Sequence, residues 1–165
     1  MIKRNSHFLL IINDILANDN VQSLKKFKHH YGSTRFEHSL SVAYYSYIIC
    51  KFLHLDYISA SRAGLLHDLF FYDDEIGYKP KFHLWKHPKI AFLNAKKNFN
   101  LNDKECDIIL KHMWPITFIP PKYIESYVIS FVDKYCAICE WLNYCSFCIL
   151  NCYSTYFLKI KRGIL

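Results

Sequence analysis

Two residue pairs with the spacing of a helix capping box constrain the fold of this chain most. Thr34 is followed three residues later by Glu37, and Asn102 is followed in the same way by Glu105. In such a pair the first side chain accepts a hydrogen bond from the first helical turn, and the second reaches back to the cap. Each box therefore predicts the start of a helix. The helix that begins after Thr34 is expected to reach about Leu53.

Glycine and proline are scarce in the chain as a whole. The chain of 165 residues contains 4 Gly and 5 Pro, too few for a fold of many short strands and turns. Hydrophobic residues make up 52% and charged residues 21%, as in a globular protein. The sequence therefore predicts an all-α fold without a sheet, a compact single domain over residues 1–165 built from six to eight helices. The other expected elements are helices over about 6–17, 20–28, 57–69 and 88–98, a helix from Asn102 that ends between His112 and Pro115, a loop over 70–86, and a long helix after Pro120-Pro121.

Residues on the inner faces of these helices follow helical spacing. Small side chains share the face of His67 and let another helix approach closely: Ala60, Ala63 and Gly64. In the helix from Thr34, spacings of four and three predict an inward stripe of His38, Val42, Tyr45, Ile49 and Phe52. In the last helix, Ile129 and Asp133 share a face with Cys136 or Ala137.

The segment "GLLHDLFFYDDE", residues 64–75, sets His67 and Asp68 side by side at the end of an apolar helical run. Burying an unpaired charge is costly, so the pair needs a partner, and a metal ion suits both side chains. One buried histidine alone is more often a satisfied core residue. Here the candidate ligands at helix ends or on inner faces form a larger set: His38, His67, Asp68, His87, His112 and Asp133.

The order "TRFEHS", "AGLLHD", "KHP", "LKHMWP" and "SFVDKY" resembles the HD-domain metal-dependent phosphohydrolase superfamily. The resemblance covers an HD-like core of about residues 30–140 and leaves 141–165 as a C-terminal helical extension. It implies that Asp68 bridges two metals. One metal would be held by His38, His67 and Asp133, and the other by His87 and His112. If His87 or His112 instead points to substrate, the site holds one metal.

Imidazole together with carboxylate suits Mn, Fe, Co or Zn, and we expect two such divalent ions. The expected reaction is hydrolysis of a phosphoester or phosphoanhydride of a nucleotide or small phosphorylated metabolite by metal-activated water. Asp68 and Arg35 are the candidate catalytic residues. Arg35 shares the helical face of His38 and is predicted either to grip a phosphate or to form a salt bridge.

Other polar residues near the candidate ligands receive more ordinary interpretations. Glu37 is explained by the capping box, and Lys111 and Lys134 are expected at the surface. The 70–86 loop is a candidate lid and substrate selector. Within it, Phe82 or Trp85 would stack on a base or, as the stronger expectation, pack in the core.

Two other functions stay open from the sequence. One is a di-iron oxygenase of HD fold. The other is a non-catalytic, metal-stabilised module that binds nucleic acid or protein. The net charge of +7 suits an anionic partner, but the lysines are scattered, so nucleic acid is the less favoured partner.

Seven cysteines, an odd number, without a signal peptide predict free thiols and a cytoplasmic protein. The two CxxC pairs, at 136/139 and 145/148, would face opposite sides of one helix, so a structural zinc is not expected.

The segment 141–158 carries no charged residue. It is predicted to be a packed helix or a homo-oligomer contact rather than a membrane span.

Overall fold

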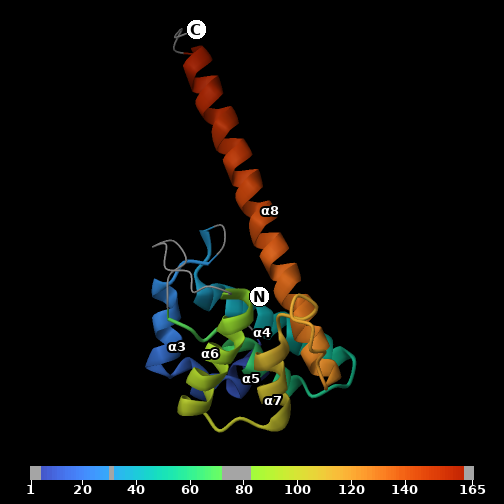
Figure 1. The fold of residues 1–165 in the computed structure, drawn as a ribbon. Coiled ribbons are helices and arrows are strands. Elements are labelled where there is room, and N and C mark those ends of the chain that lie inside the picture. The colour runs from blue at the N-terminus through green and yellow to red at the C-terminus, as the bar shows by residue number, and fades with distance from the viewer. Residues whose placement is uncertain (1–4, 30–31, 72–82, 162–165) are drawn as a thin grey trace.

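A computed structural model describes residues 5–29, 32–71 and 83–161, without the side chains of 83–84 and 145–161. These residues form eight α-helices and one 3-10 segment, and no strand, which confirms the predicted all-α fold (Figure 1). The helices are α1 (Ser6–Ile11), α2 (Asn13–Leu16), α3 (Asp19–Ser23), α4 (Arg35–Phe52), α5 (Tyr57–Leu66), α6 (His83–Asn98), α7 (Asp103–Lys111) and α8 (Ile124–Lys161), with the 3-10 segment η2 (Leu24–Lys26) after α3.

Both predicted capping boxes are confirmed. Thr34 Oγ1 accepts a hydrogen bond from Glu37 N at 3.2 Å, and Glu37 Oε2 accepts one from Thr34 N at 2.9 Å. Asn102 and Glu105 form the same reciprocal pair before α7. The caps fix where α4 and α7 begin, and so where the ligand candidates on these helices lie.

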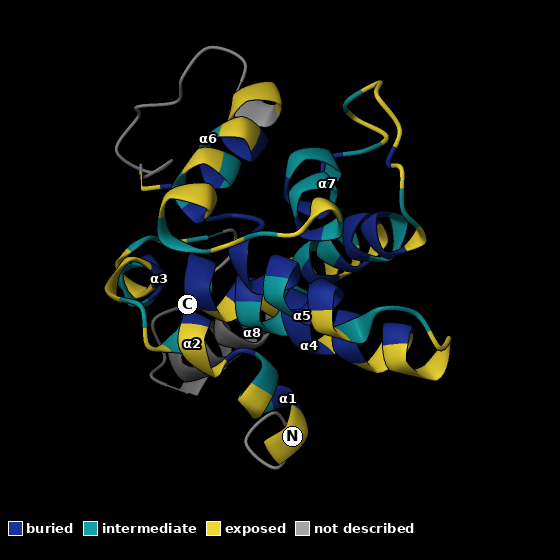
Figure 2. Cartoon of the chain, turned by 90° about the horizontal axis from the view of Figure 1, so that it is seen from below, coloured by how far each residue is buried: buried dark blue, intermediate teal, exposed yellow. Residues whose placement is uncertain are grey.

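Helix α5 lies at the centre of the bundle, and its residues are mostly buried (Figure 2). It packs against α1, α4, α6, α7 and α8. At Gly64 a Cβ atom would lie 2.9 Å from Ala43 Cα on α4 and 3.1 Å from Ile129 Cδ1 on α8. The predicted close approach of another helix along this small-residue face is therefore confirmed.

Some predicted boundaries are wrong. The first helix breaks at Ile12, whose φ of −105° and ψ of 8° are not helical. The helix predicted over 20–28 corresponds to α3, which ends at Ser23 and is followed by the 3-10 segment η2. Helix α6 begins at His83, so Pro88 lies inside the helix rather than at its first position. Residues 83–86 of the predicted loop thus belong to α6, and its residues 72–82 lie outside the described part of the chain.

The predicted inward stripe of α4 is also wrong beyond Val42. Tyr45, Ile49 and Phe52 are exposed, at 45%, 37% and 81%. The buried face turns instead through Ala43, Ser46, Tyr47 and Cys50, because α5 covers α4 from that side. In α8 the face predicted to carry Ile129 and Cys136 is turned inward, since both residues are buried.

Helix α8 continues unbroken past the bundle, so residues 141–161 of the predicted extension form the distal part of the helix that carries Asp133 (Figure 1). Trp141, Leu142 and Tyr144 are exposed, which does not fit a packed helix at that point. No helix in the described residues is long and apolar enough to cross a membrane. The homo-oligomer contact and the single-domain organisation stay predictions.

The cysteines whose side chains are described, at 50, 106, 136 and 139, are free thiols. Burial raises the pKa of both Cys50 and Cys136 to about 12. Thiols with so high a pKa stay protonated near neutral pH and pack as small apolar groups.

Candidate metal centre

The His67–Asp68 doublet lies where α5 ends, with His67 as the C-cap. Inside a helix two consecutive side chains point about 100° apart. Because the helix stops here, both side chains stay buried, with 0% of His67 and 6% of Asp68 exposed. His67 Nδ1 donates to the Gly64 carbonyl at 2.8 Å, one of the last-turn carbonyls that lack a helical partner. In the neutral tautomer that this bond selects, Nε2 carries the lone pair.

His112 repeats this arrangement at the end of α7. It is the C-cap of that helix, is 1% exposed, and its Nδ1 donates to the Ile109 carbonyl at 2.8 Å. His112 and Ile109 are three residues apart, as are His67 and Gly64. At the ends of both α5 and α7, the C-cap histidine therefore points its Nε2 atom into the bundle.

The first ligand group, defined as His38, His67, Asp68 and Asp133, joins α4, the end of α5 and α8. His38 Nε2 lies 3.0 Å from Asp133 Oδ1, and His67 Nε2 lies 3.5 Å from the same oxygen. His67 Nε2 is also 3.6 Å from Asp68 Oδ2. His38, His67 and Asp68 offer atoms close enough together to hold one ion.

The second ligand group, defined as Asp68, His87 and His112, adds α6 and α7. His87 Nε2 and His112 Nε2 lie 3.5 and 3.6 Å from Asp68 Oδ1. The two imidazole nitrogens are 2.9 Å apart. These three residues are buried and also offer atoms close enough together to hold one ion.

Asp68 belongs to both groups, with Oδ2 towards the first and Oδ1 towards the second. Two buried atoms at this junction, His67 Nε2 and Asp68 Oδ1, have no hydrogen-bond partner. An unsatisfied buried polar atom is costly unless something binds it. Imidazole and carboxylate donors that converge in this way suit divalent transition ions, so the chemistry of these residues fits a metal site.

The electrostatics of the groups also favour a cation. Burial would lower the pKa of His38, but the carboxylates of Asp133 and Glu140 raise it to about 10. Burial would raise the pKa of Asp68, but His67, His87 and His112 hold it well below its usual range. Burial, with help from the neighbouring histidines, lowers the pKa of His112 to about 3. The carboxylates thus favour positive charge at His38, whose ring must lose a proton to bind a metal. The neutral His112 and the ionised Asp68 are already in the forms that bind metals.

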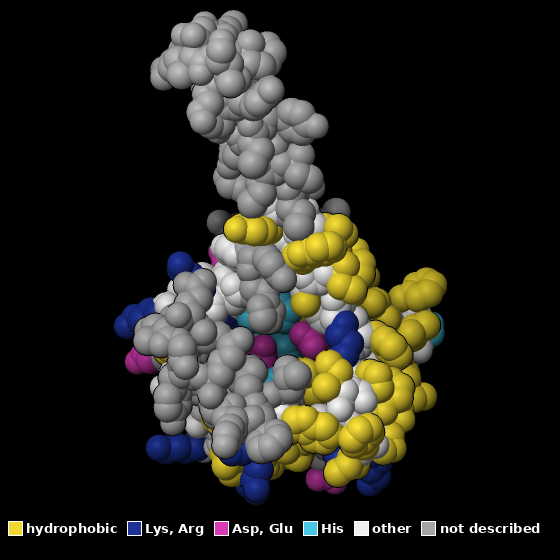
Figure 3. Space-filling view, turned by 45° about the horizontal axis from the view of Figure 1, so that its top comes forward, with side chains coloured by type: hydrophobic (Ala, Val, Ile, Leu, Met, Phe, Trp, Pro, Cys, Tyr) yellow, Lys and Arg dark blue, Asp and Glu magenta, His cyan; other side chains and the backbone are white. Residues whose placement is uncertain are grey.

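The space-filling view shows histidine and acidic side chains at the floor of a hollow (Figure 3). Hydrophobic side chains and a basic side chain border it on one side.

Two residues that the sequence reasoning missed adjoin the first group. The His29 ring stacks on His38 with ring centroids 4.0 Å apart. Glu140 Oε1 lies 2.9 Å from His38 Nδ1, and Oε2 lies 3.2 Å from His29 Nδ1. Burial would raise the pKa of Glu140, but His29 and His38 lower it to about 2. The sequence held one signal, because Glu140 is the only acidic residue after Asp133 and follows it by two helical turns.

Arg35 and Lys134 lie in surroundings that the sequence did not suggest. Arg35 is 1% exposed, stacks on Phe70 with its guanidinium 3.7 Å from the ring centroid, and donates to the Phe70 carbonyl at 2.9 Å. Its role in gripping a phosphate stays a prediction. The surface role expected for Lys134 is wrong, because its Nζ donates to the His112 carbonyl at 3.0 Å and lies 3.7 Å from Asp133 Oδ2.

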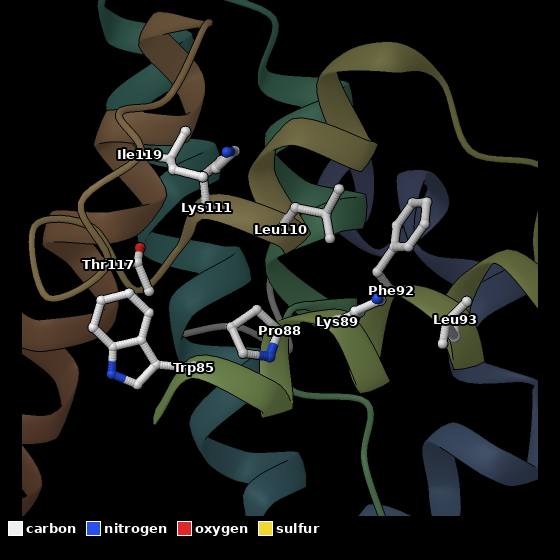
Figure 4. A pocket seen from close by; sticks show the side chains of 9 residues that line it. All are labelled: Trp85, Pro88, Lys89, Phe92, Leu93, Leu110, Lys111, Thr117 and Ile119. Atoms are coloured by element: carbon white, nitrogen blue, oxygen red, sulfur yellow. The ribbon is translucent and has the colours of Figure 1, made fainter. Parts of the chain in front are cut away.

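A groove of about 420 Å³ lies between α6, α7 and the segment that follows α7 (Figure 4). Its lining is largely apolar, with Lys89 and Lys111 among the lining residues. Trp85 lines it and is 47% exposed, so the expectation that Trp85 packs in the core is wrong. Phe82, the other residue considered for stacking, lies outside the described residues. The groove is built on the two helices that supply His87 and His112.

Comparison with known proteins agrees with this architecture. Ribonuclease Y from two strains of Ureaplasma parvum serovar 3 is 29% identical over 137 residues, which cover 83% of this chain and 26% of each relative. The chain thus spans about a quarter of the length of the curated relatives it matches. No solved structure matches the chain. The HD domain family matches residues 35–138, which include every residue of both ligand groups, and the chain belongs to this family.

Proposed function

We propose that this protein is a metal-dependent phosphohydrolase that cleaves a phosphoester or phosphoanhydride of a nucleotide or small phosphorylated metabolite. The observation that carries the proposal is the position of Asp68. Oδ2 lies 3.6 Å from His67 Nε2 in the first group, and Oδ1 lies 3.5 and 3.6 Å from the histidine nitrogens of the second group. A carboxylate placed in this way is suited to bridge two ions, as in two-metal hydrolases of phosphate esters.

In this proposal His38, His67 and Asp133 would hold one ion, His87 and His112 would hold the other, and Asp68 would be shared between them. Mn, Fe, Co and Zn are the ions that suit this donor set. Bound there, such ions supply Lewis-acid activation of a water molecule and of a phosphoryl oxygen. No covalent protein nucleophile is required.

The protein supplies orientation and the local environment. The carbonyls of Gly64 and Ile109 hold the imidazoles of His67 and His112 with Nε2 inward. The burial of the donors excludes bulk water, which strengthens electrostatic contacts with an anionic substrate. We propose that the groove at Trp85, which has two lysines in its lining, binds the base of a nucleotide.

A phosphodiester within RNA is a second candidate substrate of the same chemistry. The relative named Ribonuclease Y favours it, and so does the net charge of +7. RNA chains and mononucleotides share the phosphate and base that the centre and groove would bind. The oxygenase and the non-catalytic module are the other functions that the experiment below separates from hydrolysis.

The test is phosphate-bond cleavage by the metal-reconstituted protein on mononucleotides and short RNA, with and without oxygen. We expect hydrolysis that persists anaerobically and falls at least about a hundredfold in Asp68→Asn, because the shared ligand is changed. Asp19→Asn, at an exposed acid on α3, is the matched control and should keep full activity. Turnover that requires oxygen would identify an oxygenase. RNA binding that persists in Asp68→Asn without any cleavage would identify a binding module.

A further inference from the structure

The imidazoles of His29 and His38 lie in a stack whose rings are inclined by 23°. Both rings present Nδ1 to the same carboxylate, that of Glu140 on α8. Glu140 Oε1 is 2.9 Å from His38 Nδ1, and Oε2 is 3.2 Å from His29 Nδ1. Ser33 Oγ donates to the same Oε2 at 3.0 Å.

Because both Nδ1 atoms are anchored, both Nε2 atoms face the aspartates of the first group. His38 Nε2 is 3.0 Å from Asp133 Oδ1, and His29 Nε2 is 3.9 Å from Asp68 Oδ2. The side chains of His29 and Glu140 are 12% and 17% exposed, so water competes little for these contacts. Two ligands of one ion, each about 2.1 Å from it, lie at most about 4.2 Å apart. The separation of His29 from Asp68 is within that limit.

His29 and Glu140 lie on either side of the family match at residues 35–138. Glu140 reaches the centre because it follows Asp133 by two turns of α8 and so shares its face. His29 comes from the segment before α4, whose backbone is held by a hydrogen bond from His29 N to the Ser33 carbonyl at 2.8 Å. Two residues outside the matched region thus contact His38, a ligand of the first group.

We propose that Glu140 is a positioning residue of the metal centre and that His29 is a further histidine of its first group. This inference rests on the proposed metal centre. Glu140 holds His38 in the orientation in which Nε2 faces the ion, and it sets the neighbouring His29 in the same orientation. A carboxylate behind a metal-binding histidine also raises the basicity of that ligand.

The experiment measures Co²⁺ binding to the full chain, both as the dissociation constant and as the visible absorption of the saturated protein. Glu140→Gln keeps the side-chain shape but offers one acceptor oxygen, so one of the two imidazoles loses its anchor. We expect binding at the first group to weaken about tenfold and the absorption bands of the saturated protein to shift. His29→Asn should weaken binding in the same direction.

Glu125→Gln is the matched control. Glu125 is also a buried acid on α8, but it bonds Lys104 and the backbone of Asp56 instead of the centre. It should lower stability and leave the Co²⁺ affinity and spectrum unchanged. Ser33→Ala removes one hydrogen bond to Glu140 and should shift the spectrum slightly even if Glu140→Gln does not fold.

The outcomes separate this inference from the proposed function. If the wild-type chain binds no Co²⁺, the proposed metal centre fails. If the wild type binds Co²⁺ and Glu140→Gln binds it with the same affinity and spectrum, the positioning role alone is overturned. If Glu140→Gln weakens binding while His29→Asn leaves it unchanged, His29 is excluded from the centre.

Discussion

His87 on α6 and His112 at the end of α7 face each other with 2.9 Å between their Nε2 atoms. Since His112 Nδ1 already donates to the Ile109 carbonyl, the neutral His112 ring offers a lone pair at Nε2. With Asp68 Oδ1 at similar distance from both nitrogens, the three atoms surround a point suited to a cation.

Replacing His112 should therefore remove the second ion and leave the first. We expect His112→Ala to hold about one metal equivalent per chain where the wild type holds about two. Metal analysis after reconstitution with Mn²⁺ measures this. His54→Asn is the control, since His54 is an exposed histidine with a φ of 57° that asparagine tolerates. Two equivalents retained in His112→Ala would contradict the assignment of this residue.

Gly64 is needed for the contact between α5 and its neighbours. Alanine normally favours a helix over glycine by about 1 kcal/mol. Here its Cβ would lie 2.9 Å from the Ala43 backbone, so the helices must move apart. We expect Gly64→Ala to lower the free energy of unfolding by about 1–3 kcal/mol, measured by urea denaturation. A more stable variant would show that the contact is looser than the structure has it.

Glu125 predicts an acid-dependent loss of stability that is independent of the metal centre. Burial would raise the pKa of Glu125, but the hydrogen bond from Lys104 and backbone N–H donors lower it from 4.5. A folded-state pKa below the unfolded value stabilises the fold above that unfolded value, and the stabilisation disappears as the pH falls through the folded pKa.

Glu125→Gln should accordingly be less stable than the wild type by about 2 kcal/mol at pH 7, because charged hydrogen bonds are lost. The difference should shrink steadily below pH 4.5. Urea denaturation of both proteins across this range measures it, and the exposed Asp19→Asn should cost less than about 0.5 kcal/mol at pH 7. A difference that stays constant with pH would show that the loss comes from packing alone.

The parts of the fold that local chemistry decides could be predicted from the sequence. The capping boxes at Thr34 and Asn102 act within one helical turn, so their sequence spacing was sufficient. The face of α4 that is buried could not be found this way. Its apolar residues run around the helix, and the packing of α5 decides that Phe52 is exposed while Ser46 is buried.

The candidate site also has a part that could be predicted from the sequence and a part that could not. Histidines and aspartates at helix ends were visible as candidates, and the resemblance supplied their grouping. The structure brings His38, His67, Asp68, His87, His112 and Asp133 together around two junctions. His29 was missed because its place beside His38 depends on the path of the chain before α4, which has no periodic pattern to read.

The most direct test of the two-metal account is the metal content of the folded wild-type chain and of Asp68→Ala after reconstitution with Mn²⁺ and removal of free ions. With Asp68 shared between the groups, we predict about two equivalents in the wild type and less than one in Asp68→Ala, with the helical circular dichroism unchanged. A folded wild-type chain that retains no Mn²⁺, or an Asp68→Ala variant that still retains two equivalents, would contradict the account.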